Sequence, residues 1–493
     1  MIDRVLVAGA TGYVGGRLVP RLLDEGYRVR CLARDPSRLE GRSWFDRVEV
    51  VQGDVLQAGG LDAALGGVQA AYFLVHSMMG GADFAARDLK AARTFAEAAR
   101  RAGVQRIIYL GGLGEPTSDL SHHLRSRQAT GEALRTYGPP VTEFRAAVVV
   151  GAGSVSFEMI RYLTERLPVM ICPRWVYTRT QPIAVRDAIE YLVRALEVPE
   201  SAGRVIEIGG SDVITYGEMM LGYARVRGLR RALIPVPVLT PHLSSYWVNL
   251  VTPIPAAIAR PLIDGLRSEV VVRDDSAAEL FPDIRPVGYE DAVREALASL
   301  VGGNVESAWT DALSSSVGDT KPVALTTESG MIVERRRALV NASPAEVFRA
   351  FTALGGNRGW PYLNAAWQLR GIVDLLLGGV GTRRGRRDPD ELRVGDALDF
   401  WRVEAVQPNK LLRLRAEMKV PGRAWLQFET GPGPAGKTIL AQTAYFAPKG
   451  LLGLAYWYGL YPIHAAIFSG TIRALAKQVD GPPDAAAIER LET

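Results

Sequence analysis

The stretch VLVAGATGYVGGRLVPRLL (residues 5–23) decides the fold of the first half of the chain. Val5 to Ala8 form a short apolar run that is typical of a buried parallel strand, and a glycine turn follows at once. Gly9, Gly12 and Gly15 would allow a tight turn, a close approach of the backbone to a pyrophosphate, and close packing of a helix on the sheet. The N-terminus of that helix would face the phosphates. The stretch therefore predicts a dinucleotide-binding βαβ unit.

The alternation of strand and helix patterns continues through the first 300 residues. Further strands are expected at residues 27–34, 48–54, 69–76, 106–114 and 141–153, with helices such as residues 88–103 between them. Strands that alternate with helices are typical of a parallel sheet. We therefore predict an α/β Rossmann fold with a doubly wound parallel sheet as a domain over residues 1–300.

The end of the second strand indicates which nicotinamide cofactor is bound. An acidic residue there would hold a ribose 2′-hydroxyl, but the sequence offers Arg34. A guanidinium suits a 2′-phosphate, so NADP(H) is favoured over NAD(H). Asp35 complicates this assignment, although the DPSRL segment that it begins is more typical of a cap and turn before a short helix.

Three stretches, AGATGYVGGRLVPRLL, GDV and LGGLG, resemble those of an atypical, extended short-chain dehydrogenase/reductase over roughly residues 1–300. The resemblance implies that Arg34 binds the 2′-phosphate, that Asp54 and Val55 border the adenine, and that Val75 and His76 lie near the nicotinamide-side ribose. It also implies a pyrophosphate site formed by Gly9, Thr11, Gly12, Tyr13 and Val14.

The catalytic positions depart from the pattern of this superfamily. A Ser and a Tyr-x-x-x-Lys pair carry proton transfer there, and the matching positions here are Gly112, His123 and Arg127. His123 and Arg127 stand four apart, so on a helix they would share a face. Histidine can relay protons near neutrality, and arginine can hold ribose hydroxyls. Either the chemistry is rebuilt around His123, or the nucleotide is bound without turnover, as in NmrA-like regulators; a merely solvated polar turn is the third interpretation.

Composition narrows the possible partners and compartments. The 58 basic and 53 acidic residues leave a net charge of +5 without a long basic tract, which does not favour nucleic acid as a partner. Cys31 and Cys172 are too few for a disulfide framework, and the five histidines lack metal-ligand spacing, so no metal is expected. The N-terminus enters a strand without an export signal, which indicates a cytoplasmic protein.

A smaller, substrate-side lobe is expected from residues 183–282. Its segment 233–263 is apolar and broken by prolines, so it would pack this lobe or line a pocket for an apolar substrate. Within this segment, nothing in the sequence singles out His242 for a particular functional role. Residues 301–328 are rich in Gly, Ser, Thr and Pro and are predicted to be a linker.

A second domain is predicted over residues 329–480, followed by a tail, 481–493. Ser343, Pro344 and Glu346 form a capping box after a first strand. A second helix follows, with apolar residues at helical spacing: Leu369, Ile372, Val373 and Leu376. From Ala397 the period changes to two, which predicts an antiparallel meander. Together with a long C-terminal helix, this α+β pattern resembles the START-like helix-grip fold, which implies an apolar ligand.

The final helix carries no formal charge from Gly450 to Ile472. We favour a helix that covers the inner face of the sheet, because a single antiparallel sheet needs such a cover. Peripheral membrane contact and a true span are the alternatives. An arginine-rich loop, with Arg383, Arg384, Arg386 and Arg387, would meet an anionic surface or be solvated.

Taken together, the two halves resemble a group of bacterial two-domain proteins whose second domain has no known function. We expect an NADP(H)-dependent oxidoreductase or epimerase that acts on an apolar carbonyl, quinone or isoprenoid-like molecule. The alternative is a non-catalytic NADP(H)-sensing protein that binds a hydrophobic ligand, and a third is a lipid-handling protein at the inner membrane face. The expected partners are a small apolar substrate or a lipid.

Overall fold

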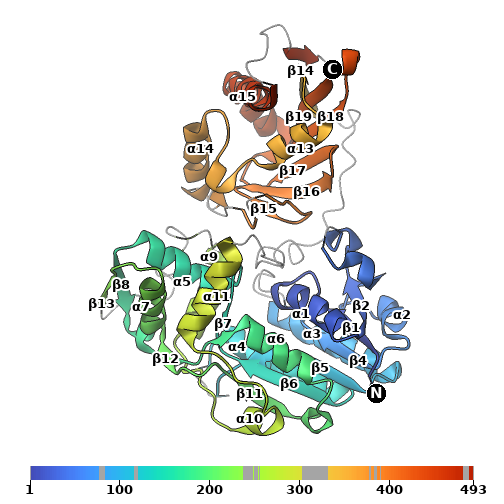
Figure 1. Cartoon of the computed structure of the whole chain (residues 1–493), viewed down its shortest axis with the longest axis vertical. Coiled ribbons are helices and arrows are strands. Elements are labelled where there is room, and N and C mark those ends of the chain that lie inside the picture. The colour runs from blue at the N-terminus through green and yellow to red at the C-terminus, as the bar shows by residue number, and fades with distance from the viewer. Residues whose placement is uncertain are drawn as a thin grey trace. The chain divides into compact units, whose positions relative to one another are not determined.

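The chain divides into two compact units, Met1–Gly318 and Asp319–Thr493 (Figure 1). The structure is a computed structural model and describes residues 2–40, 42–76, 84–115, 120–236, 248, 252, 254, 256–301, 331–376, 379–381, 386–388, 390–480 and 488–491. The division falls within the predicted linker, most of which lies outside the described residues. Each unit is therefore described by itself.

A seven-stranded parallel sheet forms the centre of the first unit, in the order β11-β6-β5-β4-β1-β2-β3. Its strands are β1 (Arg4–Ala8), β2 (Arg28–Ala33), β3 (Glu49–Gln52), β4 (Ala70–Phe73), β5 (Arg106–Gly112), β6 (Val141–Ala146) and β11 (Val205–Ile208). The strand order reverses between β1 and β4, and such a switch point opens a ligand crevice at the carboxyl ends of the strands. The predicted Rossmann-like sheet is confirmed, although β3 and β4 end two or three residues earlier than expected.

Helices cover both faces of this sheet (Figure 1). Side chains of β1 alternate between two cores: Val5 and Val7 pack with one set of helices, and Leu6 and Ala8 with the other. The first set comprises α1 (Tyr13–Asp24), α6 (Val185–Arg194) and α10 (Ser276–Leu280), and the second α2 (Leu61–Leu65), α3 (Phe84–Arg101) and α4 (His122–Tyr137). Strands that are buried on both faces explain the continuous apolar runs of the sequence.

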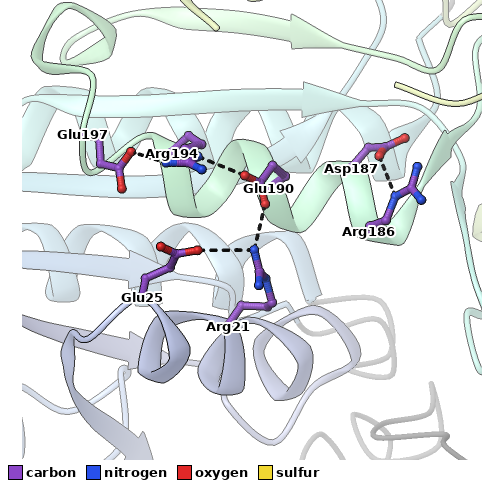
Figure 2. Close-up of polar contacts among 7 residues, drawn as sticks. All are labelled: Arg21, Glu25, Arg186, Asp187, Glu190, Arg194 and Glu197. Atoms are coloured by element: carbon purple, nitrogen blue, oxygen red, sulfur yellow. Dashed lines mark hydrogen bonds and ion pairs between the residues drawn. The ribbon is translucent and has the colours of Figure 1, made fainter. Parts of the chain in front are cut away.

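Ion pairs join α1 to α6 at the surface (Figure 2). Arg21 Nη2 lies 3.0 Å from Glu190 Oε2 and 3.4 Å from Glu25 Oε1. Glu190 also accepts a hydrogen bond from Arg194 Nε at 2.9 Å. Exposed pairs of this kind contribute only about 0–1 kcal/mol each. The buried contacts of Leu18, Val19 and Leu22 therefore do most to fix α1 beside the glycine turn.

The remaining elements of the first unit form a smaller lobe with its own apolar core. They are β7 (Val149–Val150), α5 (Val155–Arg166), β8 (Val169–Pro173), β9 (Arg179–Thr180), β10 (Ile183–Ala184), β12 (Ile214–Thr215), α7 (Tyr216–Val226), β13 (Ala232–Val236), α9 (Ala256–Gly265) and α11 (Tyr289–Val301). His242 and most of the proline-broken segment lie outside the described residues, so their predicted role stays a prediction.

The second unit is built on an antiparallel sheet in the order β15-β16-β17-β18-β19-β14-β20. Its elements are β14 (Ile332–Val340), α13 (Pro344–Thr352), α14 (Asn364–Leu376), β15 (Ala397–Leu398), β16 (Trp401–Gln407), β17 (Leu411–Ala416), β18 (Gly422–Pro432), β19 (Thr438–Pro448), α15 (Gly450–Asp480) and β20 (Ile488–Leu491). The predicted capping box of Ser343 and Glu346 is present at α13. The predicted meander is likewise observed, because β16 to β19 pair in sequence order.

The two apolar helices of this unit, α14 and α15, are only partly covered by its core. α15 packs on β14 and β19, but its buried side chains are concentrated after Ile467, and its first half is largely exposed. It is long and apolar enough, by length and composition, to cross a membrane. The stripe of α14 does not face the core: Leu369 is 63% and Leu376 83% exposed, while Trp367 and Asp374 are buried. The predicted helix is therefore present, and its apolar stripe is left on the outside of the unit.

Candidate functional site

The glycine turn after β1 lies at the switch point of the parallel sheet. Gly9 has φ +107°, and a Cβ there would be 2.7 Å from the carbonyl oxygen of Leu74. A Cβ on Gly15 would be 2.2 Å from the carbonyl oxygen of Gly9. Gly12 is the N-cap of α1 and supplies no side-chain cap. The first turn of α1, with Tyr13 and Val14, thus presents its backbone N–H groups at the glycine turn, and helix N-termini of this kind fit a pyrophosphate.

Arg34 follows β2 at the same edge of the sheet. Its backbone carbonyl accepts a hydrogen bond from Gln52 Nε2 at 3.1 Å, and no carboxylate of the described residues pairs with its guanidinium. Asp35 is instead engaged with Arg38, 3.6 Å away, in the turn that was expected. Asp35 therefore does not form an ion pair with the Arg34 guanidinium. This agrees with the predicted role of Arg34 at a 2′-phosphate.

The next predicted pair, Asp54 and Val55, lies beyond β3. Asp54 Oδ1 accepts a hydrogen bond from the backbone N–H of Leu56 at 3.0 Å. Val55 is buried and packs in the core with Leu61 and Leu65. The backbone of Val55, and not its side chain, would therefore border an adenine. Thr11 is partly exposed in the glycine turn, where it would reach the phosphates.

Arg34→Ala is expected to remove the discrimination between the two nicotinamide cofactors. Because the guanidinium would bind only the 2′-phosphate, the wild-type chain should bind NADPH at least ten times more tightly than NADH, about 1.4 kcal/mol. Calorimetric titration of both nucleotides measures the ratio, which should fall toward one in the variant. Arg28→Ala, at the opposite end of β2, is the matched control. Equal affinities of the wild type for the two nucleotides would contradict the assignment.

Two histidines meet beyond the ends of β4 and β5. His76 follows β4 and Val75, and His123 lies in the first turn of α4; their ring centroids are 5.0 Å apart. His76 Nδ1 lies 2.7 Å from Asp88 Oδ2 on α3, and Asp88 is only 4% exposed. His76 Nε2 has no hydrogen-bond partner among the described residues. An aspartate that orients an imidazole beside a second imidazole is an arrangement suited to proton transfer.

Both histidines are biased toward their neutral forms. Burial, followed by the positive charges of His76, Arg127 and His122, holds the pKa of His123 well below its ordinary value of 6.5. Burial also lowers the pKa of His76, although the hydrogen bond to Asp88 opposes this shift. The low pKa values make either imidazolium a strong acid toward a bound substrate.

Arg127 is bound to the sheet and is not free in this structure. Its Nη2 donates to the carbonyl of Leu110, and its guanidinium carbon lies 5.1 Å from the ring centroid of Tyr109. The hydroxyl of Tyr109 in turn donates to the carbonyl of Arg127 at 2.9 Å. A Cβ on Gly112 would lie 2.7 Å from Leu124 Cδ2, so Leu124 fills the space that a serine side chain would need.

A buried carboxylate fixes α4 on the sheet. Glu143 of β6 is 0% exposed and pairs with Arg135 of α4 and, at 2.8 Å, with Arg145. Gly131 allows this approach, because a Cβ there would be 2.4 Å from Glu143 Oε2. Removal of one partner of such a buried pair is strongly destabilising. Buried contacts therefore fix α4, the helix that carries His123 in its first turn, on the sheet.

Sequence reasoning missed Asp88. It stands in the second turn of the alanine-rich helix α3, and residues 77–83, outside the described part, lie between that helix and β4. No local pattern distinguishes Asp88 from the other charged residues of α3. The only signal would have been an acid on the face of a helix that otherwise carries buried alanines.

The second unit has a cluster of buried polar groups beneath α15. Arg336 pairs with Glu334 on the inner face of β14, and the Tyr461 hydroxyl lies 3.5 Å from Glu334 Oε1. Glu334 Oε2, Gln442 Oε1 and His464 Nδ1 are buried without hydrogen-bond partners among the described residues. Burial lowers the pKa of His464 to about 4, so it is neutral at pH 7. Unpartnered buried groups of this kind are rare and indicate a place for water or ligand.

In the arginine-rich loop of the second unit, the two described arginines, Arg386 and Arg387, do not form an anion site. Arg387 is 1% exposed and its Nε lies 3.0 Å from Asp396 Oδ1. Arg386 donates to the carbonyls of Thr352, Leu354 and Asp388. Both guanidinium groups make internal contacts, and the burial of the Arg387 side chain contradicts both alternatives for it, contact with an anionic surface and solvation. Arg383 and Arg384 lie outside the described residues.

Comparisons with known proteins agree with the geometry of the first unit. Residues 9–139 match a family described as NAD(P)H-binding, and residues 331–471 match one described as a protein of unknown function (DUF2867). A ceramide reductase of Caulobacter vibrioides is 31% identical over 242 residues, which cover 47% of this chain and 73% of that protein.

Two further proteins are similar to the same half. A (4-alkanoyl-5-oxo-2,5-dihydrofuran-3-yl)methyl phosphate reductase of Streptomyces griseus is 31% identical over 231 residues, 45% of this chain and 74% of that protein. The solved structure of a triphenylmethane reductase of Citrobacter sp. is 21% identical with a TM-score of 0.50, and the match covers 60% of this chain and 99% of that one. The similarity to the triphenylmethane reductase structure shows the fold alone.

Proposed function

Because the chain belongs, through its first unit, to the NAD(P)H-binding family of NmrA-like, short-chain dehydrogenase/reductase-type proteins, we propose that it reduces an apolar carbonyl compound with NADPH. The family comprises NAD(P)-dependent reductases and epimerases, and the nicotinamide cofactor of the prediction is confirmed by the family model. The observation that carries the proposal is the Asp88–His76–His123 group, which stands beyond the strand ends where the glycine turn also lies.

The chain's own residues supply binding and proton transfer in this proposal. The glycine turn and the first turn of α1 hold the pyrophosphate, and Arg34 holds the 2′-phosphate. The bound cofactor supplies a hydride. His123 donates a proton to the carbonyl oxygen, so that the substrate gains one hydride at carbon and one proton at oxygen. Asp88 accepts from His76 Nδ1–H and leaves Nε2 to share the proton with His123.

The apolar substrate class has two supports. One relative is named as a reductase of ceramide, and a second as a reductase of an alkanoyl compound. We propose further that the second unit is a START-like helix-grip domain that captures an apolar molecule. The unpartnered acceptors Glu334 Oε2 and Gln442 Oε1 favour a ligand whose head group donates hydrogen bonds.

The expected result is NADPH consumption that grows with the length of the substrate's alkyl chain. Loss of NADPH absorbance would be followed with 2-butanone, 2-octanone and 2-tridecanone, which share one carbonyl, and with short- and long-chain quinones. Each buried methylene contributes ~0.8 kcal/mol, so kcat/KM should rise by about four-fold per methylene while the chain remains within the site. A rate independent of chain length would contradict the apolar substrate class.

One observation favours the alternative of a nucleotide sensor without turnover. The Arg127 guanidinium is bound to the Leu110 carbonyl and to the Tyr109 ring, where the superfamily's lysine would hold the ribose. Tight NADPH binding without consumption of NADPH across the whole panel would therefore support the sensor and overturn the reductase.

A further inference from the structure

The exposed large apolar side chains of the second unit are concentrated on two helices. Within the described part of this unit, all of them lie at residues 362–376 or 451–463. They are Tyr362, Leu363, Leu369, Ile372, Val373, Leu376, Leu451, Leu452, Leu454, Tyr458 and Ile463. We refer to these side chains as the apolar face. Exposed apolar side chains that are grouped in this way can mark an interaction site in a soluble protein.

Contacts between α14, α15 and the turn before β18 join the two parts of the apolar face. The Tyr362 ring lies against Gly470, where a Cβ would be 2.0 Å from Tyr362 Cδ1. Arg370 Nη2 donates to the carbonyl of Lys419 at 3.0 Å, and the backbone N–H of Lys449 donates to the carbonyl of Pro421 at 3.0 Å. The turn at 417–421 therefore touches both α14 and the start of α15.

Three exposed cations stand where the apolar face begins on α15. Lys449 directly precedes the helix, and Lys419 and Arg423 each lie two residues from Pro421. The neighbouring acids are already engaged: Asp374 accepts the Lys419 backbone N–H at 2.6 Å, and Glu417 pairs with Arg402 at 2.9 Å. This edge of the apolar face is therefore positively charged.

We propose that the apolar face docks onto an anionic lipid bilayer. Leu451 and Leu452, which are 84% and 73% exposed, enter the boundary between head groups and acyl chains, and the three cations bind lipid phosphates. The helix lies along the membrane surface and does not cross it, because its second half, with Phe468, Ile472 and Leu475, is buried in the core of the unit. The proposal does not depend on the proposed reductase activity.

Flotation of the full-length protein with lipid vesicles tests this docking surface. The wild-type protein should float with vesicles of phosphatidylcholine and phosphatidylglycerol in equal amounts, and bind pure phosphatidylcholine more weakly. Leu451→Glu should lower the affinity about ten-fold or more, because one exposed leucine can no longer be buried. Leu89→Glu, at a 46% exposed leucine on α3, is the matched control and should leave the affinity unchanged.

A second variant separates charge from apolar insertion. Exchange of Lys419, Arg423 and Lys449 for glutamine should lower the affinity for the anionic vesicles about 100-fold, since each basic residue near an anionic surface contributes about five-fold. The affinity for pure phosphatidylcholine should not change. Circular dichroism melting of each variant establishes that it is folded.

Several outcomes would overturn the proposal. They are failure of the wild-type protein to float with the anionic vesicles, and flotation that Leu451→Glu leaves intact. A dimer in analytical ultracentrifugation that Leu451→Glu dissociates, without vesicle binding, would assign the apolar face to a second copy of the chain. If the protein stayed in the vesicle membrane after washes with high salt and carbonate, α15 would instead span the bilayer.

Discussion

The His123→Phe variant is expected to lose about 10² to 10⁴-fold in the rate of NADPH oxidation, the usual effect of removing a general acid. NADPH affinity should change little, because His123 lies beyond the glycine turn that binds the phosphates. His122→Phe is the matched control on the same helix: His122 is exposed, and its charge has the smallest of the influences that lower the pKa of His123, so this variant should keep most of the wild-type rate. Turnover at the wild-type rate in His123→Phe would refute the assignment of His123 as proton donor.

The rate of NADPH oxidation should depend on pH in a direction that a purely structural role of His123 would not produce. His123 must be protonated to donate, so kcat should fall as pH rises through its pKa, which burial and neighbouring charges hold well below 6.5. In His76→Gln, one of the groups that lowers this pKa is gone, so the midpoint of the profile should move to higher pH. An unchanged midpoint in that variant would contradict the coupling of the two imidazoles.

Gly15→Ala is expected to abolish nucleotide binding for a steric reason. The added Cβ would lie 2.2 Å from the Gly9 carbonyl oxygen and 2.7 Å from its carbon, both backbone atoms. α1 would have to move away from the turn, and overpacking of this kind costs about 1–3 kcal/mol of stability. Because the phosphates would bind where the turn meets α1, NADPH affinity should fall at least 100-fold, about 2.7 kcal/mol.

Calorimetric titration with NADPH and thermal unfolding measure the two effects of Gly15→Ala separately. Gly59→Ala is the control, because a Cβ at Gly59 meets no atom within 4 Å. It should leave both NADPH affinity and the unfolding temperature close to those of the wild type. A Gly15→Ala variant that binds NADPH with wild-type affinity would show that this turn does not form the phosphate site.

Features that depend on neighbouring residues in the chain could be predicted from the sequence. The glycine spacing determined the turn after β1, because only glycine tolerates φ +107° and the contact between Gly15 and Gly9. The Ser343–Glu346 capping box and the alternation in β17 are equally local, since they follow from helical and strand periods. The match of Gly112, His123 and Arg127 to the superfamily's Ser, Tyr and Lys also came from the sequence, through the resemblance, and it stays a prediction.

Features that depend on contacts between separate elements were decided only by the tertiary structure. The pairing of Asp88 with His76, and the approach of His76 to His123, require α3, β4 and α4 to meet at one edge of the sheet. The burial of Arg387 and the exposure of the α14 stripe are of the same kind. A period of 3.6 residues shows that a helix has an apolar face, but only the packing of the other elements decides whether the core covers that face or leaves it to solvent.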